Sequence, residues 1–453
     1  MTQFRRSLGF VDVVLFFVIA CTNLQWVATA AAAGPQSLTV WLIGAFAMFF
    51  PLSLVVMKLG SRFPDEGGMY VWSKRAFGPL AGFMTGWTYW CSNLPYFPAL
   101  MYFTAGNALF IWGGGTQLSG SPAYYVAFSL IAFGFATALN VFGLGTGKWL
   151  VNVAAAGRWI VTIGLIAVAV ASWMRFGSAT PIDAASLRPS AHLRDLIFWS
   201  VIAFAWTGPE SIPFMGAEIK DSSRSMARGL GIAAPAIAAI YIFGTASVLV
   251  TLPAAHVSAI YGVMQAIERG GSHLGWGAIV PVAGVLVTIS CLGSAGAWLA
   301  SIARIPLVAG IDRYLPPVFG RVDPRSGSPV VALLTQAVIS ALFIIAGQSG
   351  SSVKDAYDIM VSATVLITMI PFAFLFASAL KLHPTPLVIG ASILGLVTTF
   401  GAMLLSLFPA DGETNATLSV IKVLLLTALM LGGGAAIYVI GARKRDQHAI
   451  ETV

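Results

Sequence analysis

Apolar stretches of about 20 residues recur along the whole chain, and they limit its fold more than any other feature. A helix needs about 20 predominantly apolar residues to cross the hydrocarbon core of a bilayer. Hydrophobic residues fill 58% of the 453 positions, charged residues fill 9%, and the mean hydropathy is +0.86. These values are typical of integral membrane proteins and exclude an ordinary soluble domain. We therefore predict an all-α, polytopic membrane protein that lies in the lipid bilayer.

Counting the apolar stretches predicts twelve transmembrane helices in a single transporter domain. They cover roughly residues 10–33, 36–59, 80–108, 122–143, 149–173, 195–218, 228–252, 275–304, 329–347, 355–380, 384–409 and 417–441. An even number of spans puts both termini on one side. Of the 25 Lys and Arg residues, 18 then fall on that side, six on the other and Arg158 within a span. Basic loops face the cytoplasm, so we predict cytoplasmic termini in a plasma membrane or bacterial inner membrane. This topology accounts for the basic pI, and we infer no nucleic-acid partner from it.

The N-terminus has one alternative interpretation, a secretory signal, because Arg5 and Arg6 precede an apolar run that ends in alanine-rich sequence. That run is too long for a signal core, and cleavage would leave eleven spans with the basic loops still requiring the same orientation. Cys21, Cys91 and Cys291 fall within predicted spans and have neither a disulfide pattern nor metal-ligand spacing. We expect no metal site and no cofactor.

The sixth predicted span is interrupted. Residues 204–213 read Phe-Ala-Trp-Thr-Gly-Pro-Glu-Ser-Ile-Pro. Proline has no N–H group, so the carbonyls of Ala205 and Pro209 lose their helical donors, and Gly208 lets the chain leave helical dihedrals. Irregular backbone and an ionisable residue such as Glu210 survive at membrane depth only beside protein or a watery cavity. The segment therefore predicts a broken helix that lines a transport pathway.

Two loops on the predicted cytoplasmic side carry specific sequence. The first reads Phe-Pro-Asp-Glu-Gly-Gly-Met-Tyr-Val-Trp over residues 63–72, and its glycines and proline indicate a short helix between turns. The second contains Arg304, then Asp-Arg-Tyr-Leu-Pro over residues 312–316 and Gly-Ser-Pro over residues 327–329. In isolation, both loops are ordinary connectors.

Together with residues 204–210, these loops resemble those of the amino acid/polyamine/organocation permeases. That family has FP-x-x-GG-x-Y in its first loop, FA-[FW]-x-G-x-E in its sixth helix, and R, then D, LP and G-x-P in its eighth loop. The matches cover about residues 10–330 in the family's order, and the run from Ala33 to Trp90 is most similar to the polyamine uptake and glutamate/GABA antiporter branches. The resemblance implies a LeuT-like fold with two inverted repeats of five spans, 10–173 and 195–380, and two additional helices over 384–441.

The resemblance places the substrate between the first and sixth spans, both broken near their midpoints. Many relatives have a Gly-small-Gly triplet in the first span, whereas this chain has Ala20, Cys21 and Thr22. The side chains of Thr22 and Asn23 would then form the hydrogen bonds to the substrate that exposed backbone N–H groups form in those relatives. The alternative is that these side chains form ordinary hydrogen bonds between packed helices. The substrate-binding residues that the resemblance implies are Ala20, Cys21, Thr22, Asn23, Phe204, Ala205, Trp206 and Gly208.

Phe204 and Trp206 resemble the aromatic lid that the family places over its substrate, with ordinary packing as the alternative. Glu210 is assigned a coupling or gating role. Arg158 lies deep in the fifth span, where a lysine in proton-driven relatives resembles a substitute for a sodium ion. Arginine does not deprotonate in proteins, so Arg158 would act as a fixed charge that holds the first, fifth and eighth spans together. A fixed charge at this position favours exchange, facilitated movement or proton coupling through Glu210 as the transport mode. The alternative for Arg158 is a purely structural pairing.

These observations predict a secondary active transporter that moves a small amino acid or polyamine by alternating access, as a monomer or homodimer. A major-facilitator-type transporter would share the length and span count, but it should carry a G-x-x-x-D-R-type loop where residues 60–65 read Gly-Ser-Arg-Phe-Pro-Asp. A membrane-embedded enzyme would need a nucleophile with its base, or a metal cluster, in the spans. No predicted span contains a histidine, so this class is disfavoured.

Overall fold

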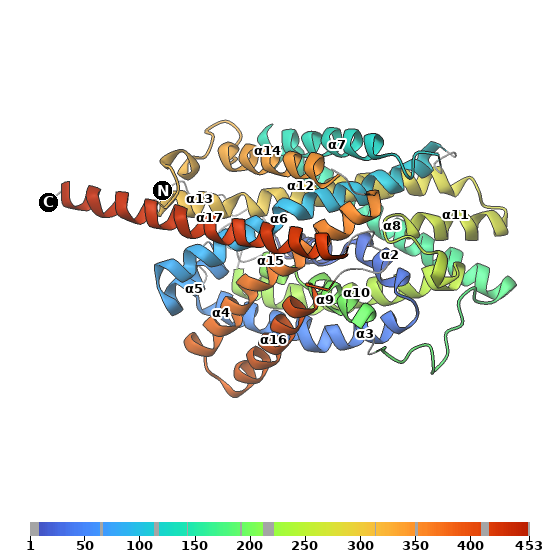
Figure 1. Ribbon diagram of the computed structural model, residues 1–453. Coiled ribbons are helices and arrows are strands. Elements are labelled where there is room, and N and C mark those ends of the chain that lie inside the picture. The colour runs from blue at the N-terminus through green and yellow to red at the C-terminus, as the bar shows by residue number, and fades with distance from the viewer. Residues whose placement is uncertain are drawn as a thin grey trace.

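The structure is a computed structural model, and it describes residues 9–63, 67–112, 117–142, 144–190, 193–211, 222–312, 314–348, 352–408 and 416–451. Every regular element within these ranges is helical, which confirms the all-α prediction (Figure 1).

The helices follow the predicted apolar stretches. In chain order they are α1 (Phe10–Cys21), α2 (Leu24–Ala32), α3 (Gln36–Gly44), the π-helical turn η1 (Ala45–Phe49), α4 (Phe50–Arg62), α5 (Met69–Phe77), α6 (Pro79–Ala108), η2 (Leu109–Trp112), α7 (Pro122–Phe142), α8 (Leu144–Phe176), α9 (Leu193–Ala205), α10 (Ser222–Thr251), η4 (Ala254–His256), α11 (Gly262–Leu274), α12 (Ile279–Ile302), α13 (Arg304–Ile311), η5 (Pro317–Gly320), α14 (Val330–Gly347), α15 (Val353–Leu382), α16 (Pro386–Leu405) and α17 (Ala416–Glu451).

Nine helices in the described ranges are long and apolar enough to cross a membrane. The predicted spans outside this set are the first, the third and the sixth. The first is divided between α1 and α2, and the described part of the sixth ends with α9, so each piece is too short to be counted. The third is α6, which has 30 residues but carries polar residues through its middle. Every predicted stretch thus contains helix, and twelve crossings remain a prediction.

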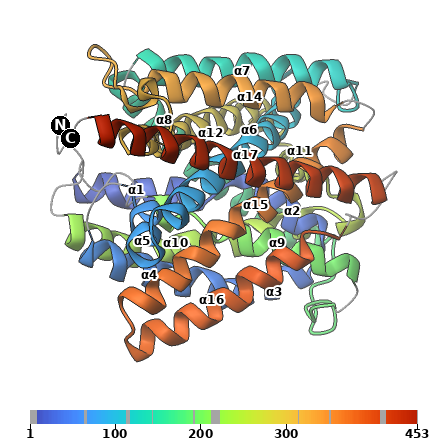
Figure 2. The ribbon, with the colours of Figure 1, turned by 60° about the vertical axis from the view of Figure 1, so that its left-hand side comes forward.

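The long helices lie side by side in one bundle (Figures 1 and 2). In its interior, α6 packs against α15 and α12, α8 packs against α12, and α1 packs against α10. In both views α7 and α14 lie along one side of the bundle and α16 along the opposite side. At the left of Figure 1, α5, α13 and the C-terminal end of α17 share one end of the bundle, while α11 lies at the other end.

The two loop motifs meet at the end of the bundle that holds α5 and α13. The Tyr70 hydroxyl donates to Oδ2 of Asp312 at 2.5 Å, and the Lys74 ammonium lies 2.6 Å from the same oxygen. Burial and then the hydrogen bond to Asp312 raise the pKa of Tyr70, so its hydroxyl keeps its proton at neutral pH. Tyr314 stacks on Tyr438 of α17 with ring centroids 4.9 Å apart. The motifs therefore form a packed layer that joins α5, α13 and α17.

Candidate functional site

The first span breaks between α1 and α2, at Thr22 and Asn23. Asn23 is extended (φ −141°, ψ 128°), and its Oδ1 accepts the N–H of Gln25 at 3.1 Å, which caps α2. The Thr22 hydroxyl donates to the Val18 carbonyl in the last turn of α1. Asparagine is a favoured N-cap because its side chain satisfies a donor that has no helical partner. The break therefore forms without glycine, through capping side chains.

The sixth span breaks where its sequence predicts. Helix α9 ends at Ala205, Thr207 and Gly208 are irregular, and residues 209–211 form a short 3₁₀ turn. Gly208 has φ +128°, a backbone conformation that only glycine adopts readily. Pro213, the second proline of the predicted break, lies outside the described residues.

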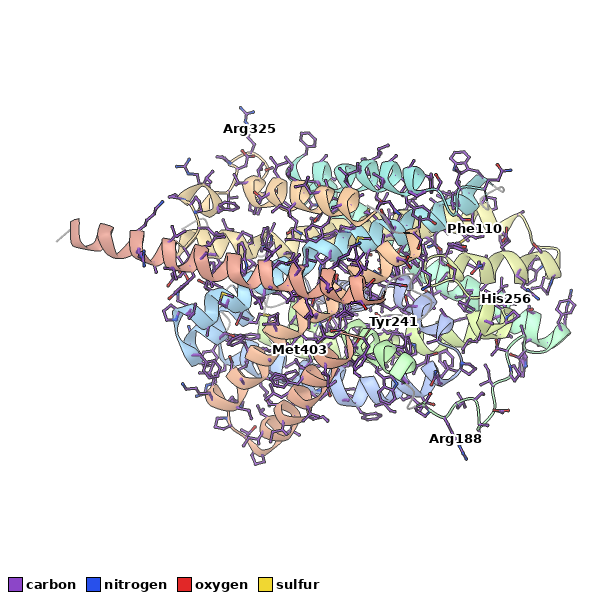
Figure 3. All side chains as sticks on the ribbon, in the orientation of Figure 1. Phe110, Arg188, Tyr241, His256, Arg325 and Met403 are labelled. Atoms are coloured by element: carbon purple, nitrogen blue, oxygen red, sulfur yellow. The ribbon has the colours of Figure 1, made fainter. Side chains whose placement is uncertain are left out.

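One tyrosine hydroxyl joins the two breaks. Tyr241 on α10 accepts the N–H of Asn23 at 3.3 Å, and its hydroxyl oxygen lies 2.9 Å from the Cys21 carbonyl and 3.1 Å from the Ala205 carbonyl. The Ala205 carbonyl is one of the two acceptors that lose a helical donor to proline, and the Tyr241 hydroxyl offers a replacement hydrogen that this carbonyl shares with that of Cys21. Figure 3 shows Tyr241 near the middle of the bundle, where backbone without a donor would be most unfavourable.

Glu210 follows the second break and is 1% exposed. Its Oε1 accepts the Tyr89 hydroxyl from α6 at 2.7 Å, and its Oε2 accepts the N–H of Gly208 at 2.7 Å. Both oxygens accept, as those of an ionised carboxylate do. Within the described ranges no Lys or Arg forms a salt bridge with it. Among the described residues this carboxylate is held by hydrogen-bond donors and by no cation, which is unfavourable for stability alone, and its coupling or gating role remains a prediction.

Arg158 is 2% exposed on α8. Its Nε donates to Ser290 Oγ at 3.2 Å, and its Nη2 donates to Ser294 Oγ, both on α12. Its Nη1 donates to the carbonyl and the hydroxyl of Thr22 at the first break. The guanidinium thus contacts the first, fifth and eighth predicted spans at once. Its part in transport remains a prediction.

A cavity of about 40 Å³ lies between the two breaks and is also walled by α6, α10, α12 and α15. The predicted site residues on its wall are Thr22, Asn23, Phe204, Ala205 and Glu210. Each water molecule occupies about 10–15 Å³ on this measure of volume, so the cavity has room for about three waters. In this structure the cavity is therefore too small for an amino acid or a polyamine.

Trp206 does not line the cavity in this structure, which fits the packing alternative, and its part in a lid remains a prediction. It is fully buried against Trp41 and Phe49, with ring centroids 5.5 and 5.0 Å apart, and its Nε1 donates to the Trp41 carbonyl at 3.1 Å. A Cβ on Gly44 would lie 2.7 Å from the indole, so that glycine gives the ring its space. The chain leaves the helix after Ala205, and this turns the indole into the bundle.

Cys21 and Gly208 contribute backbone atoms beside the cavity and are not part of its wall. Cys21 contributes its backbone carbonyl, which the Tyr241 hydroxyl contacts. Gly208 contributes its N–H to Glu210. Ala20 belongs to the last turn of α1, and its side chain lies outside the described part of the chain.

Six aromatic residues line the cavity, and four of them form a row of neighbouring rings in which only Phe204 was a predicted site residue. Trp26 lies edge-on to Phe204 with centroids 5.3 Å apart, Phe204 lies 6.3 Å from Tyr96, and Tyr96 lies 6.3 Å from Trp298. We call these four residues the aromatic row. They come from α2, α9, α6 and α12, so no single sequence segment shows them together.

One signal for the α6 wall was present in the sequence. Tyr89, Asn93 and Tyr96 recur at helical spacing within an otherwise apolar stretch, and all three line the cavity. Polar residues on one face of a membrane helix face the bundle interior or a watery cavity. Tyr241 gave no comparable signal, because it is a single tyrosine in a largely apolar span.

The sequence pattern described as "Amino acid permease" matches residues 8–431 of this chain. An uncharacterized transporter of Legionella pneumophila is 26% identical over 391 residues, which are 84% of this chain and 82% of that protein. The probable agmatine/putrescine antiporter AguD of Lactococcus lactis is 23% identical over 346 residues, 76% of this chain and 73% of that protein. The crystal structure of MhsT in complex with L-phenylalanine superposes with a TM-score of 0.61 at 15% identity, covering 89% of this chain and 99% of that one. This likeness confirms the predicted LeuT-like fold.

Proposed function

The chain belongs to the amino acid permease family, and from that premise we propose that its substrate occupies the cavity between the two helix breaks. It is a secondary transporter of amino acids or amines, and its relatives are transporters rather than enzymes. The observation that carries the proposal is the shared Tyr241 hydroxyl, which ties the Asn23 and Ala205 backbones to one point beside the buried carboxylate of Glu210. Backbone atoms freed from helix pairing are the groups that transporters of this architecture use for ligands.

The closed cavity supports transport by alternating access. With about 40 Å³ it holds water but no amino acid or polyamine, so the substrate enters only when the surrounding helices move apart. Phe204 closes one side of the cavity against Trp26, consistent with a lid. The proposed moving units are the two repeats, residues 10–173 and 195–380, each of which contains one break.

In this mechanism Arg158 is a fixed cation and Glu210 is the group that responds to substrate and protons. A guanidinium keeps its proton, so Arg158 holds the Thr22 carbonyl and α12 in place through the cycle. Glu210 connects the Gly208 backbone to Tyr89 of α6 and would sense any charge that enters the cavity. We propose exchange, or proton coupling through Glu210, as the driving mode.

The proposed orientation places the end of the bundle with α5 and α13 in the cytoplasm. Lys74 and Arg75 on α5 and Arg321 and Arg325 near η5 lie at this end, and basic residues favour the cytoplasmic side. The proposed location is a plasma membrane or bacterial inner membrane, with both termini inside.

Glu210→Gln is expected to flatten the pH dependence of transport. It should also raise KM for a cationic substrate about tenfold, because the substrate loses one favourable charge interaction with the carboxylate. The carboxylate of the parent protein gains a proton as pH falls, so parent transport should decline towards acid pH, whereas glutamine keeps the shape without titrating. Initial rates in liposomes from about pH 5 to 8 measure this effect. Glu268→Gln, on α11 away from the cavity, is the matched control, and an unchanged profile in Glu210→Gln would contradict the proposed role.

Solute counterflow tests the proposed function itself. Purified protein is reconstituted into liposomes loaded with one unlabelled amine or amino acid, and accumulation of the labelled form is followed. The proposal expects transient accumulation of at least one small amino acid or polyamine. The absence of counterflow for the whole set, with protein that is monodisperse and inserted, would overturn it.

A further inference from the structure

Among the described residues around the cavity, hydrogen-bond acceptors outnumber the donors that remain available to a ligand, and this difference favours a cationic substrate over an anionic group. Resting on the proposed function, we infer that this site takes an amine cation without an α-carboxylate, such as a linear diamine, and discriminates against the amino acid of the same length. Three groups of atoms around the cavity favour such a cation: the bonded backbone N–H groups, the acceptor oxygens and the aromatic rings.

Three of the backbone N–H groups that a substrate carboxylate could use are already bonded within the protein. At the first break, Asn23 N–H donates to Tyr241, Gln25 N–H to Asn23 Oδ1 at 3.1 Å, and Trp26 N–H to the Asn23 carbonyl at 3.1 Å. A helix N-terminus attracts an anion through such groups only while they are free. The Asn23 side chain thus occupies the position of the anion.

The Gly208 N–H and the Arg158 guanidinium also donate to groups of the protein. The N–H of Gly208 at the second break donates to Glu210. Arg158 donates from Nε, Nη1 and Nη2 to Ser290, Thr22 and Ser294, and it lies behind the cavity wall rather than on it. A carboxylate in this cavity would therefore face Glu210 and break existing hydrogen bonds to find a donor, and both effects oppose its binding.

Acceptors, in contrast, are in surplus. The Tyr241 hydroxyl has one hydrogen but lies within hydrogen-bond distance of two carbonyls, those of Cys21 and Ala205. One of the two carbonyls is therefore always without that hydrogen and can accept an ammonium N–H. Among the described residues on the cavity wall, Glu210 is the only one with a formal charge, and it is negative.

The aromatic row adds a surface that suits a cation. Trp26, Phe204, Tyr96 and Trp298 are linked by centroid distances of 5.3 to 6.3 Å around the cavity. An ammonium over such rings is attracted by their electron-rich faces, most strongly where water is excluded. A carboxylate gains nothing from the electron-rich faces of these rings. All three observations favour the same substrate class.

Putrescine and L-ornithine form a matched pair for the test, because they differ only in the α-carboxylate. Binding of both to the purified protein in nanodiscs is measured by calorimetry, and L-ornithine amide, which keeps the size but removes the negative charge, is the third ligand. We expect putrescine to bind about 30-fold more tightly than ornithine, because the buried carboxylate of ornithine would lack a hydrogen-bond partner. The affinity of the amide should lie between those of the other two ligands. Equal or tighter binding of ornithine would overturn the inference.

Tyr241→Phe sharpens the test, because it removes the group that caps the Asn23 N–H. That donor then becomes available to a carboxylate, and the preference for putrescine over ornithine should fall about tenfold. Tyr102→Phe is the matched control: its hydroxyl bonds Gln348 at 3.0 Å, away from the cavity, and the preference should stay at the parent value. An unchanged preference in a folded Tyr241→Phe protein would overturn the capping argument. If that variant does not fold, the parent preference between putrescine and ornithine decides the inference.

The outcomes separate this inference from the proposed function. Binding and counterflow of ornithine at least as strong as those of putrescine would refute the amine preference while leaving a transporter. Failure of every ligand in both assays would refute the preference together with the proposed function.

Discussion

Replacing Gly208 with leucine is expected to abolish transport while leaving the protein folded and inserted. Gly208 has φ +128°, which L side chains rarely adopt, and holding another residue there costs about 1–3 kcal/mol. The expected response is a shift of the local backbone, which moves the N–H that holds Glu210 at 2.7 Å. Because this backbone forms the proposed site, a small shift is enough to lose substrate. Uptake in liposomes, normalised to the amount of inserted protein, measures the effect.

Gly390→Leu is the matched control for this substitution. Gly390 lies within α16, far from the breaks in sequence, and a Cβ there meets nothing within 4 Å. The control should transport like the parent protein. Near-normal uptake by well-expressed Gly208→Leu would contradict the claim that this segment forms the site.

Arg158→Ala should reduce transport about 100-fold, because each buried acceptor left without its donor costs about 1–3 kcal/mol. The substitution removes the donors of the Thr22 carbonyl and of two serine hydroxyls on α12. The first break would then lose its connection to α8 and α12. Arg175→Ala, an exposed position at the end of the same helix, controls for loss of a positive charge. Parent-like transport by Arg158→Ala would place this residue outside the transport core.

Arg158→Lys separates a fixed charge from a titrating one. A buried ammonium loses its proton more readily than a guanidinium, so transport by this variant should fall as pH rises from about 5.5 to 8.5. The parent protein should show no such loss from this residue. The same liposome assay, run across that range, compares the two. Equal pH profiles in the parent and lysine proteins would contradict the fixed-cation role.

The sixth-span break was predictable because its causes are local. Proline removes a donor wherever it stands, and Gly208 permits the unusual dihedral, so residues 204–210 already indicated irregular backbone. The donor that rescues the Ala205 carbonyl was not predictable. It comes from Tyr241, 36 residues further along the chain, and nothing in that apolar span marks its hydroxyl.

The first-span break followed from the resemblance and not from backbone chemistry, since no glycine occurs at positions 20–22. The structure shows why glycine is dispensable: Asn23 caps α2 and Tyr241 holds Asn23. The position of Trp206 in the core, which is the packing alternative, has a similar origin. Helix α9 ends at Ala205, so the direction of the Trp206 side chain cannot be inferred from that of Phe204 by helical spacing. Phe204 faces the cavity, whereas Trp206 points into the core.

Cryo-electron microscopy of the protein in nanodiscs with saturating putrescine tests the central claim most directly. The claim is that the cavity between the two breaks is the substrate site. We predict density for one diamine there, with one ammonium within hydrogen-bond distance of Glu210 or the Ala205 carbonyl and the carbon chain against Phe204 and Trp26. An empty cavity, or ligand bound elsewhere, in protein that exchanges putrescine under the same conditions would contradict the account.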